Sequence, residues 1–184
     1  MTSQKEELLK QLSATIGKTK VTTLSRILKE QQFALRDLVD IIFYADRNIA
    51  FRACWILENI LLLDPVSYAD ELQYLLSRIA EVKHESCKRH YAKILMHITD
   101  KRSPQIIRDE LQKTDLEPVV AQCFDWLIDA KVKIAVKVFA GEALFNLRFR
   151  YPWITEELSN QIKFLMRNGS PAIQSRGRKL LALL

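Results

Sequence analysis

Three consecutive residues of this 184-residue chain, Gly17, Lys18 and Thr19, match the end of a phosphate-binding loop. In such a loop, backbone amides and a lysine hold the phosphates of a nucleotide, and the motif needs an earlier glycine and a preceding β-strand. The earlier glycine is absent because position 12 is Leu, and the residues before Gly17 follow a helical pattern. We therefore interpret Gly17 as the C-terminal stop of a first helix and expect no nucleotide site.

Histidines and cysteines form a second group of candidate residues. His84, His90 and His97 fall on one predicted helix, and His90 and His97 are two turns apart, but a metal site would need a third ligand from elsewhere. The cysteines match no metal-binding spacing, so we expect small core residues at Cys54, Cys87 and Cys123. Since no serine lies in a nucleophile motif either, the sequence predicts no catalytic residue, no metal and no cofactor.

Helices are the elements expected to position these side chains. Apolar residues recur every three to four positions, and the chain has only 4 Gly and 5 Pro, which favours an all-α fold with short turns. The predicted helices cover residues 3–15, 23–31, 34–46, 48–63, 66–82, 84–99, 104–113, 117–129, 131–149, 153–168 and 171–184.

Four of these helices share a pattern, with a basic residue at the fourth position and a stripe of small and apolar residues after it. Two of the intervals between the basic residues are close to the length of a helix-pair repeat, about 40 residues, and the third is longer by about one short helix. Residues 104–113 can supply that extra helix. The four segments are "IAFRACWILENIL", "SCKRHYAKILMHI", "IAVKVFAGEALFNL" and "IQSRGRKLLALL", with the basic residues Arg52, Arg89, Lys137 and Arg176.

In these segments the chain resembles the HEAT and armadillo class of helical repeats, over roughly residues 34–184. The departures from the family pattern are Lys137 in place of arginine and Gly177 inside a helix. The resemblance implies a right-handed α–α superhelix of about four helix pairs with an N-terminal helical extension, and a binding scaffold without implied chemistry. We expect one domain over residues 1–184, with N-terminal helices in 1–33 and helix pairs in 34–184.

Charge is distributed unevenly along these pairs, although the net charge is only +6. The second helix of each later pair carries an excess of Lys and Arg, whereas the first helices are acidic or neutral. If the second helices line the concave side, as in other solenoids, that side is basic and attracts phosphates or acidic peptides. The residues predicted to form this basic surface are Arg89, Lys93, Lys133, Lys137 and Arg176.

The leading hypothesis is a non-catalytic adaptor that binds an acidic protein segment or peptide on this surface. The first alternative is a nucleic-acid-binding repeat protein. The second is a helical DNA-base glycosylase, which would need an exposed carboxylate beside an aromatic residue such as Trp55, Trp126 or Trp153. A structural interpretation competes with all three hypotheses for Arg52 and Arg176. Each of these residues could pair with an acidic residue of a neighbouring repeat.

Further expectations concern the core, the C-terminus and the compartment. We expect Leu181 and Leu184 either to meet a second copy of the chain or to fold back on the preceding helix. No segment is apolar enough to span a membrane, and we expect a cytoplasmic protein. The residues predicted to be largely buried are Trp55, Leu57, Ile94, Leu95, Phe139, Leu144 and Leu180.

Overall fold

The computed structural model describes residues 3–14, 17–31 and 33–184, and the elements in these ranges are all helical. Eleven α-helices and two short 3-10 helices follow one another along the described chain, without a strand. The elements are α1 (Ser3–Ser13), α2 (Lys18–Glu30), α3 (Leu35–Ile41), α4 (Arg47–Leu63), η1 (Val66–Glu71), α5 (Leu72–Ser77), η2 (Ile79–Glu81), α6 (Glu85–Ile98), α7 (Gln105–Lys113), α8 (Glu117–Ile128), α9 (Ile134–Leu147), α10 (Ile154–Met166) and α11 (Pro171–Leu181).

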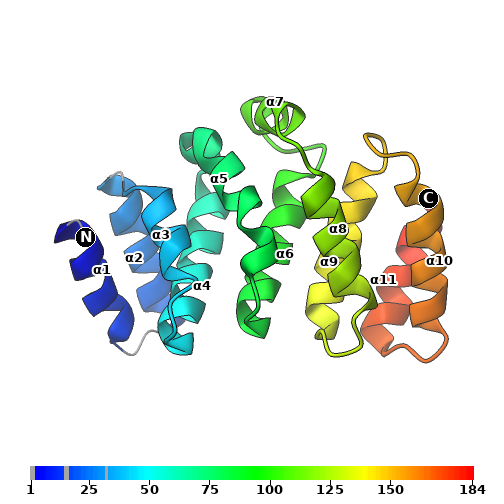
Figure 1. Cartoon of the computed structure of the whole chain (residues 1–184), viewed down its shortest axis with the longest axis horizontal. Helices are drawn as coiled ribbons and strands as arrows, with labels where there is room; N and C mark the ends of the chain where they lie inside the picture. Colours follow the sequence, from blue (N-terminus) through cyan, green and yellow to red (C-terminus); the bar gives the residue numbers. More distant parts are fainter. Residues whose placement is uncertain (1–2, 15–16, 32) are drawn as a thin grey trace.

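The helices form two layers (Figure 1). Helices α2, α4, α6, α9 and α11 contact one another in this order and form what we name the B layer. Helices α1, α3, α5, α8 and α10 form the A layer on its other side, and α7 lies against η1 and α5. This arrangement confirms the predicted all-α stack of helix pairs, with the four similar helices side by side in one layer.

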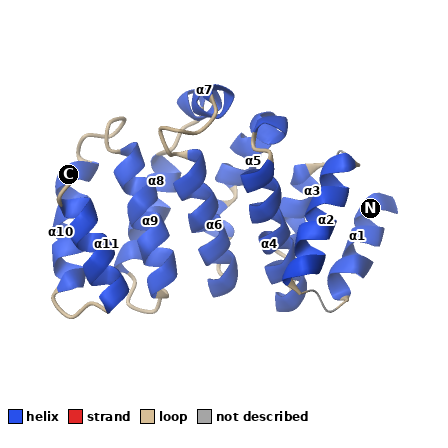
Figure 2. Cartoon of the chain, turned by 180° about the vertical axis from the view of Figure 1, so that it is seen from behind, coloured by secondary structure: helices blue, strands red, loops and turns tan. Residues whose placement is uncertain are grey.

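The connections between the layers lie along two opposite edges. Loops from an A helix to the B helix that follows it run along the lower edge in Figure 1, and loops from a B helix to the next A helix run along the upper edge. Seen from behind in Figure 2, the B helices therefore rise in parallel from the lower edge. The side of the B layer that faces away from the A layer is named the B face below.

Local sequence explains several helix starts. Asp46 precedes α4, and its carboxylate accepts hydrogen bonds from the backbone N–H groups of Asn48 (2.8 Å) and Ile49 (3.1 Å). Ser170 caps α11 in the same manner, and Pro171 occupies the first turn, where a missing N–H costs nothing. The predicted start of the last helix at residue 171 is therefore confirmed.

Several helix predictions differ from the structure. Helix α3 ends at Ile41, five residues before the predicted end at 46. Gly17 does not stop the first helix but is the N-cap of α2, which begins five residues earlier than expected. The threonines of its first turns fit a helix because their hydroxyls bond back to the preceding turn, as Thr22 does to the Lys18 carbonyl (3.1 Å). The segment 66–82 is not one helix but three short pieces, with a non-helical backbone at Tyr68.

Most of the predicted core is buried between the two layers. Leu57, Ile94, Leu95, Leu144 and Leu180 are buried, as are all three cysteines. The prediction was wrong for Trp55 and Phe139, which are only partly buried. Both side chains lie on the solvent side of B helices, and this position gives them a place in the candidate site.

Candidate binding face

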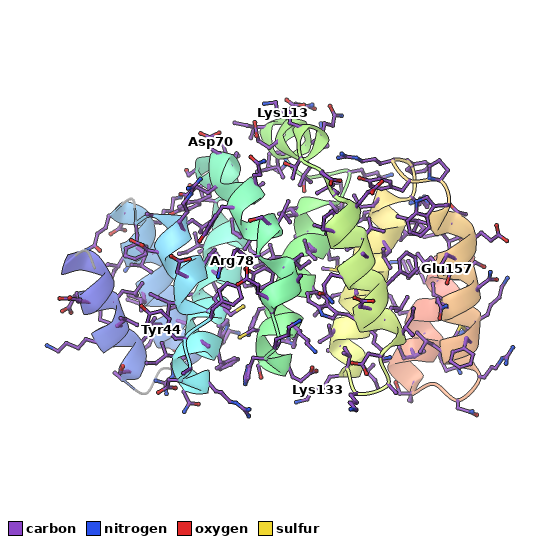
Figure 3. The ribbon with its side chains drawn as sticks, in the orientation of Figure 1. Tyr44, Asp70, Arg78, Lys113, Lys133 and Glu157 are labelled. Atoms are coloured by element: carbon purple, nitrogen blue, oxygen red, sulfur yellow. The ribbon has the colours of Figure 1, made fainter. Side chains whose placement is uncertain are left out.

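The structure brings only two of the five predicted binding residues together on the B face. Arg89 and Lys93 lie one turn apart on α6, where Arg89 is exposed and Lys93 is half-buried. Lys133 is exposed at the start of α9, on the lower edge (Figure 3). Lys137 is buried and Arg176 is engaged in an ion pair, so neither presents a free charge on the B face.

Lys137 has a structural position instead. Its ammonium donates a hydrogen bond to the carbonyl of Leu127 (2.8 Å), in the last turn of α8. Burial lowers the pKa of Lys137, and the hydrogen bond compensates part of the lost hydration. Arg52 acts in a similar way, since its guanidinium donates to the carbonyl of Leu12 (2.5 Å) in the last turn of α1.

Arg176 confirms the structural alternative considered for it. Its guanidinium pairs with the carboxylate of Glu142, on the neighbouring B helix α9. Three of the four recurrent basic residues therefore hold the stack together, as helix-end donors or as an ion pair between repeats. Arg89 differs, because it forms no hydrogen bond or ion pair with any residue that the structure describes.

Lys93 belongs to a buried polar network that the sequence did not reveal. Glu58 on α4 is 5% exposed, and its carboxylate accepts from Lys93 Nζ (2.5 Å) and from the Nδ1 of His90 (2.6 Å). Burial raises the pKa of Glu58, but the hydrogen bonds from His90 and Lys93 outweigh this effect, and the pKa lies below its usual value. The pair on α6 thus holds a buried carboxylate in its charged form.

Aromatic side chains surround this network and continue across the B face. The His90 ring lies 5.5 Å from Phe51 and 6.5 Å from Trp55, measured between ring centroids. On α9, the partly buried Phe139 and Phe145 flank Glu142 on the solvent side of the helix. We name the set Trp55, Phe139, Phe145 and Phe149 the aromatic row.

The upper end of the aromatic row carries a further cation. Arg148 lies over two rings, with its guanidinium carbon 3.6 Å from the centroid of Phe145 and 4.1 Å from that of Phe149. Phe149 is 81% exposed, whereas phenylalanine side chains are usually buried unless another molecule covers them. Aromatic rings stacked with arginine and open to solvent are typical of protein interaction sites.

The histidines do not form a metal site. His90 is held by Glu58, His97 is exposed farther along α6, and His84 lies on the lower edge, where its Nδ1 is 3.6 Å from the Cys87 sulfur. Within the described ranges, no three His, Cys, Asp or Glu side chains are placed to share a metal ion.

The B face does not have the arrangement expected of a glycosylase site. Such a site needs an exposed carboxylate beside an aromatic ring, and on the B face Glu58 is buried in its network and Glu142 pairs with Arg176. The tryptophans are dispersed as well: Trp126 is buried in the A layer, and Trp153 stacks on Phe124 with 5.5 Å between ring centroids.

The sequence matches the family model of the HEAT repeat domain over residues 8–184. The chain therefore belongs to the HEAT repeat family, and the match includes the N-terminal helices that lie outside the resemblance noted from sequence. No curated protein and no solved structure matches the chain. Among the helices described, none combines the length and the apolar character that a membrane span requires.

Proposed function

We propose that this HEAT repeat protein is a non-catalytic scaffold that binds an acidic protein segment or peptide on the B face of α4, α6 and α9. The observation that carries the proposal is the partly exposed aromatic row beside Arg89, Lys93 and Arg148. Aromatic side chains supply apolar contact area, and the cations supply attraction for acidic side chains. The expected partner therefore carries both acidic and apolar residues.

Arg89 has the central place in this proposal. Its guanidinium is exposed and lacks an acidic partner in the described chain, whereas the nearby Lys93 is partly neutralised by Glu58. A bound carboxylate can accept two parallel hydrogen bonds from a guanidinium without displacing an internal ion pair. Arg148 is held in place by its two rings, so little conformational freedom is lost when a carboxylate binds.

Fluorescence anisotropy with a labelled peptide that alternates Glu and Phe tests this function, with a Gln and Phe peptide for comparison. We expect the acidic peptide to bind and the double variant Arg89→Glu/Arg148→Glu to weaken binding at least about tenfold, by charge repulsion at both positions. The matched control is Lys101→Glu/Lys163→Glu, which makes the same charge change at exposed residues outside the B face. Equal losses of affinity in the two double variants would show that the effect depends on net charge alone, which would contradict binding on the B face.

A homodimer through the C-terminal helix is a second partner proposal. Leu181 and Leu184 pack partly buried against the protein's own core, which leaves Leu183 as an exposed leucine at this end of the molecule. Light scattering over a range of protein concentrations tests the dimer. A constant monomer mass at high concentration would exclude it.

A further inference from the structure

The lower edge carries exposed cations that no internal contact uses. Arg47 begins α4, Lys83 lies just before α6, and Lys131 and Lys133 lie just before α9. All four side chains are exposed, and none forms an ion pair with another described residue. We name these four residues the lower basic edge; Figure 3 shows Lys133 at this edge, on the same side of the molecule as Tyr44.

The acidic residues near this edge are already engaged. Asp46 caps α4, and the Asp129 carboxylate accepts from the backbone N–H of Lys131 (2.8 Å). Glu85 pairs with the ammonium of Lys88 (2.6 Å). Glu85 is balanced by Lys88, whereas Asp46 and Asp129 keep their negative charge while they accept from backbone amides. The edge therefore carries four cations against these two carboxylates, and its field is positive.

Two more acidic groups complete the surroundings. Glu81 pairs with Arg78 (2.5 Å) and also lines a cavity together with Arg47 and Lys83. Asp125 is exposed on α8 and borders, with Lys83 and Lys88, a hollow of about 490 Å³. Among the described acids of these surroundings, Asp125 is thus the exposed one without an internal partner, and it lies on α8 in the A layer.

The cations of adjacent repeats lie close enough to act together. Arg47 and Lys83 line one cavity of about 360 Å³, with His84 at its wall. Burial lowers the pKa of His84, and the positive charges of Arg47 and Lys133 lower it further, so both cations lie near this ring. The start of α9 is tied to the start of α6, since the Lys133 N–H faces the Glu85 carboxylate at 3.5 Å.

The fold adds its own positive potential at the same edge. Helices α4, α6 and α9 are parallel neighbours, and all three begin at the lower edge (Figures 1 and 2). The N-terminus of each helix carries partial positive charge, which favours anions and phosphates. At α4, the Asp46 carboxylate already accepts from the N–H groups of Asn48 and Ile49. Side-chain and helix-end charges therefore have the same sign along three successive repeats.

We propose that the lower basic edge binds the phosphate backbone of duplex nucleic acid, independently of base sequence. Neighbouring helices are spaced by roughly 8–10 Å, so cations at the starts of three successive B helices face a polymer with regularly repeated charge. An acidic protein fits less well, because protein interfaces need an apolar centre. The exposed large apolar side chains of α8 and α9 are the two isoleucines Ile128 and Ile134, which supply less apolar area than the centre of a protein interface.

Anisotropy with a labelled duplex of arbitrary sequence tests this inference at several salt concentrations. We expect wild-type binding at low salt, with a log-log salt slope of about −0.9 for each phosphate contact. The triple variant Lys83→Glu/Lys131→Glu/Lys133→Glu should weaken binding at least about tenfold and flatten the slope by about two to three contacts. The matched triple variant at exposed lysines elsewhere, Lys101→Glu/Lys163→Glu/Lys179→Glu, should change affinity by less than about threefold.

Each outcome has a defined meaning. No duplex binding by the wild type at low salt, or equal losses in the two triple variants, would overturn the proposal. Displacement of the duplex by polyglutamate at equal charge concentration would overturn the assignment to phosphate. Since the B-face variant Arg89→Glu/Arg148→Glu leaves the lower basic edge intact, it should retain duplex binding. Failure here is therefore distinguishable from failure of the peptide-binding function.

Discussion

The ammonium of Lys137 donates a hydrogen bond to the carbonyl of Leu127, 2.8 Å away in the last turn of the preceding helix. The last carbonyls of a helix have no partner within it, and the repeated basic position supplies one. Arg52 does the same for Leu12 at the end of α1. The repeated basic position was predicted to form a binding surface, but at Arg52 and Lys137 it connects a B helix to the preceding A helix.

Replacing Lys137 with Met tests this role, because Met keeps much of the side-chain volume and removes the donor. We expect the free energy of unfolding to fall by about 1 to 3 kcal/mol, since the Leu127 carbonyl loses its bond in a buried place. Urea denaturation measures the change. Lys133→Met is the control at an exposed position four residues away, with an expected change within about 0.5 kcal/mol.

The buried carboxylate of Glu58 should make stability depend on pH in the acidic range. Its folded pKa lies below the usual 4.5, so its contribution is present above that value and is lost as pH falls through the folded pKa. The difference in unfolding free energy between wild type and Glu58→Gln should therefore be largest near neutral pH and shrink toward pH 3. Glu110→Gln, in the exposed pair with Lys113, is the control and should show little difference at any pH.

The two helical stripes of α9 should respond differently to truncation. Leu144 is fully buried, and Leu144→Ala should cost about 2 to 5 kcal/mol. Phe139 is partly exposed, so Phe139→Ala should cost less than the 3 to 5 kcal/mol typical of an enclosed phenylalanine. Chemical denaturation compares the two variants. A larger loss for Phe139 than for Leu144 would contradict the assignment of the faces.

Two helical glycines give opposite predictions for substitution by alanine. A Cβ on Gly141 would meet its nearest neighbours at 3.8 and 3.9 Å, which is ordinary contact, so Gly141→Ala should stabilise by about 0.5 to 1 kcal/mol. A Cβ on Gly177 would lie 2.5 Å from the sulfur of Met166 and 3.1 Å from Ile162. Because α10 packs directly on this glycine, Gly177→Ala should lose that gain or destabilise the protein. Thermal unfolding of both variants measures the difference.

The repeat spacing predicted the layer in which each helix lies, but it did not predict which cations are free. Lys133 and Lys137 stand four residues apart in one basic stretch, yet Lys133 is exposed and Lys137 is buried. The difference depends on where α8 ends in space, and sequence periodicity does not contain that position. The sequence also did not indicate that Phe139 is partly exposed. Helix α9 is apolar on nearly every side, so its sequence does not show which side faces the core.

The Glu58 network is a second feature that could not be predicted from the sequence. Glu58 stands in an apolar stretch of α4, which indicates burial, but its partners come from α6, more than 30 residues later in the chain. Pairing across two helices depends on their relative rotation. The isolated acid in an apolar helix is the one sequence feature that could have pointed to this network.

The central claim, that the B face of α4, α6 and α9 is the binding surface, is tested most directly by NMR chemical-shift mapping with the Glu and Phe peptide. We predict that shifts concentrate at Arg89, Lys93 and the aromatic row, with little change in the A-layer helices α3, α8 and α10. Saturable shifts confined to the A layer, or spread evenly over the surface, would contradict the claim.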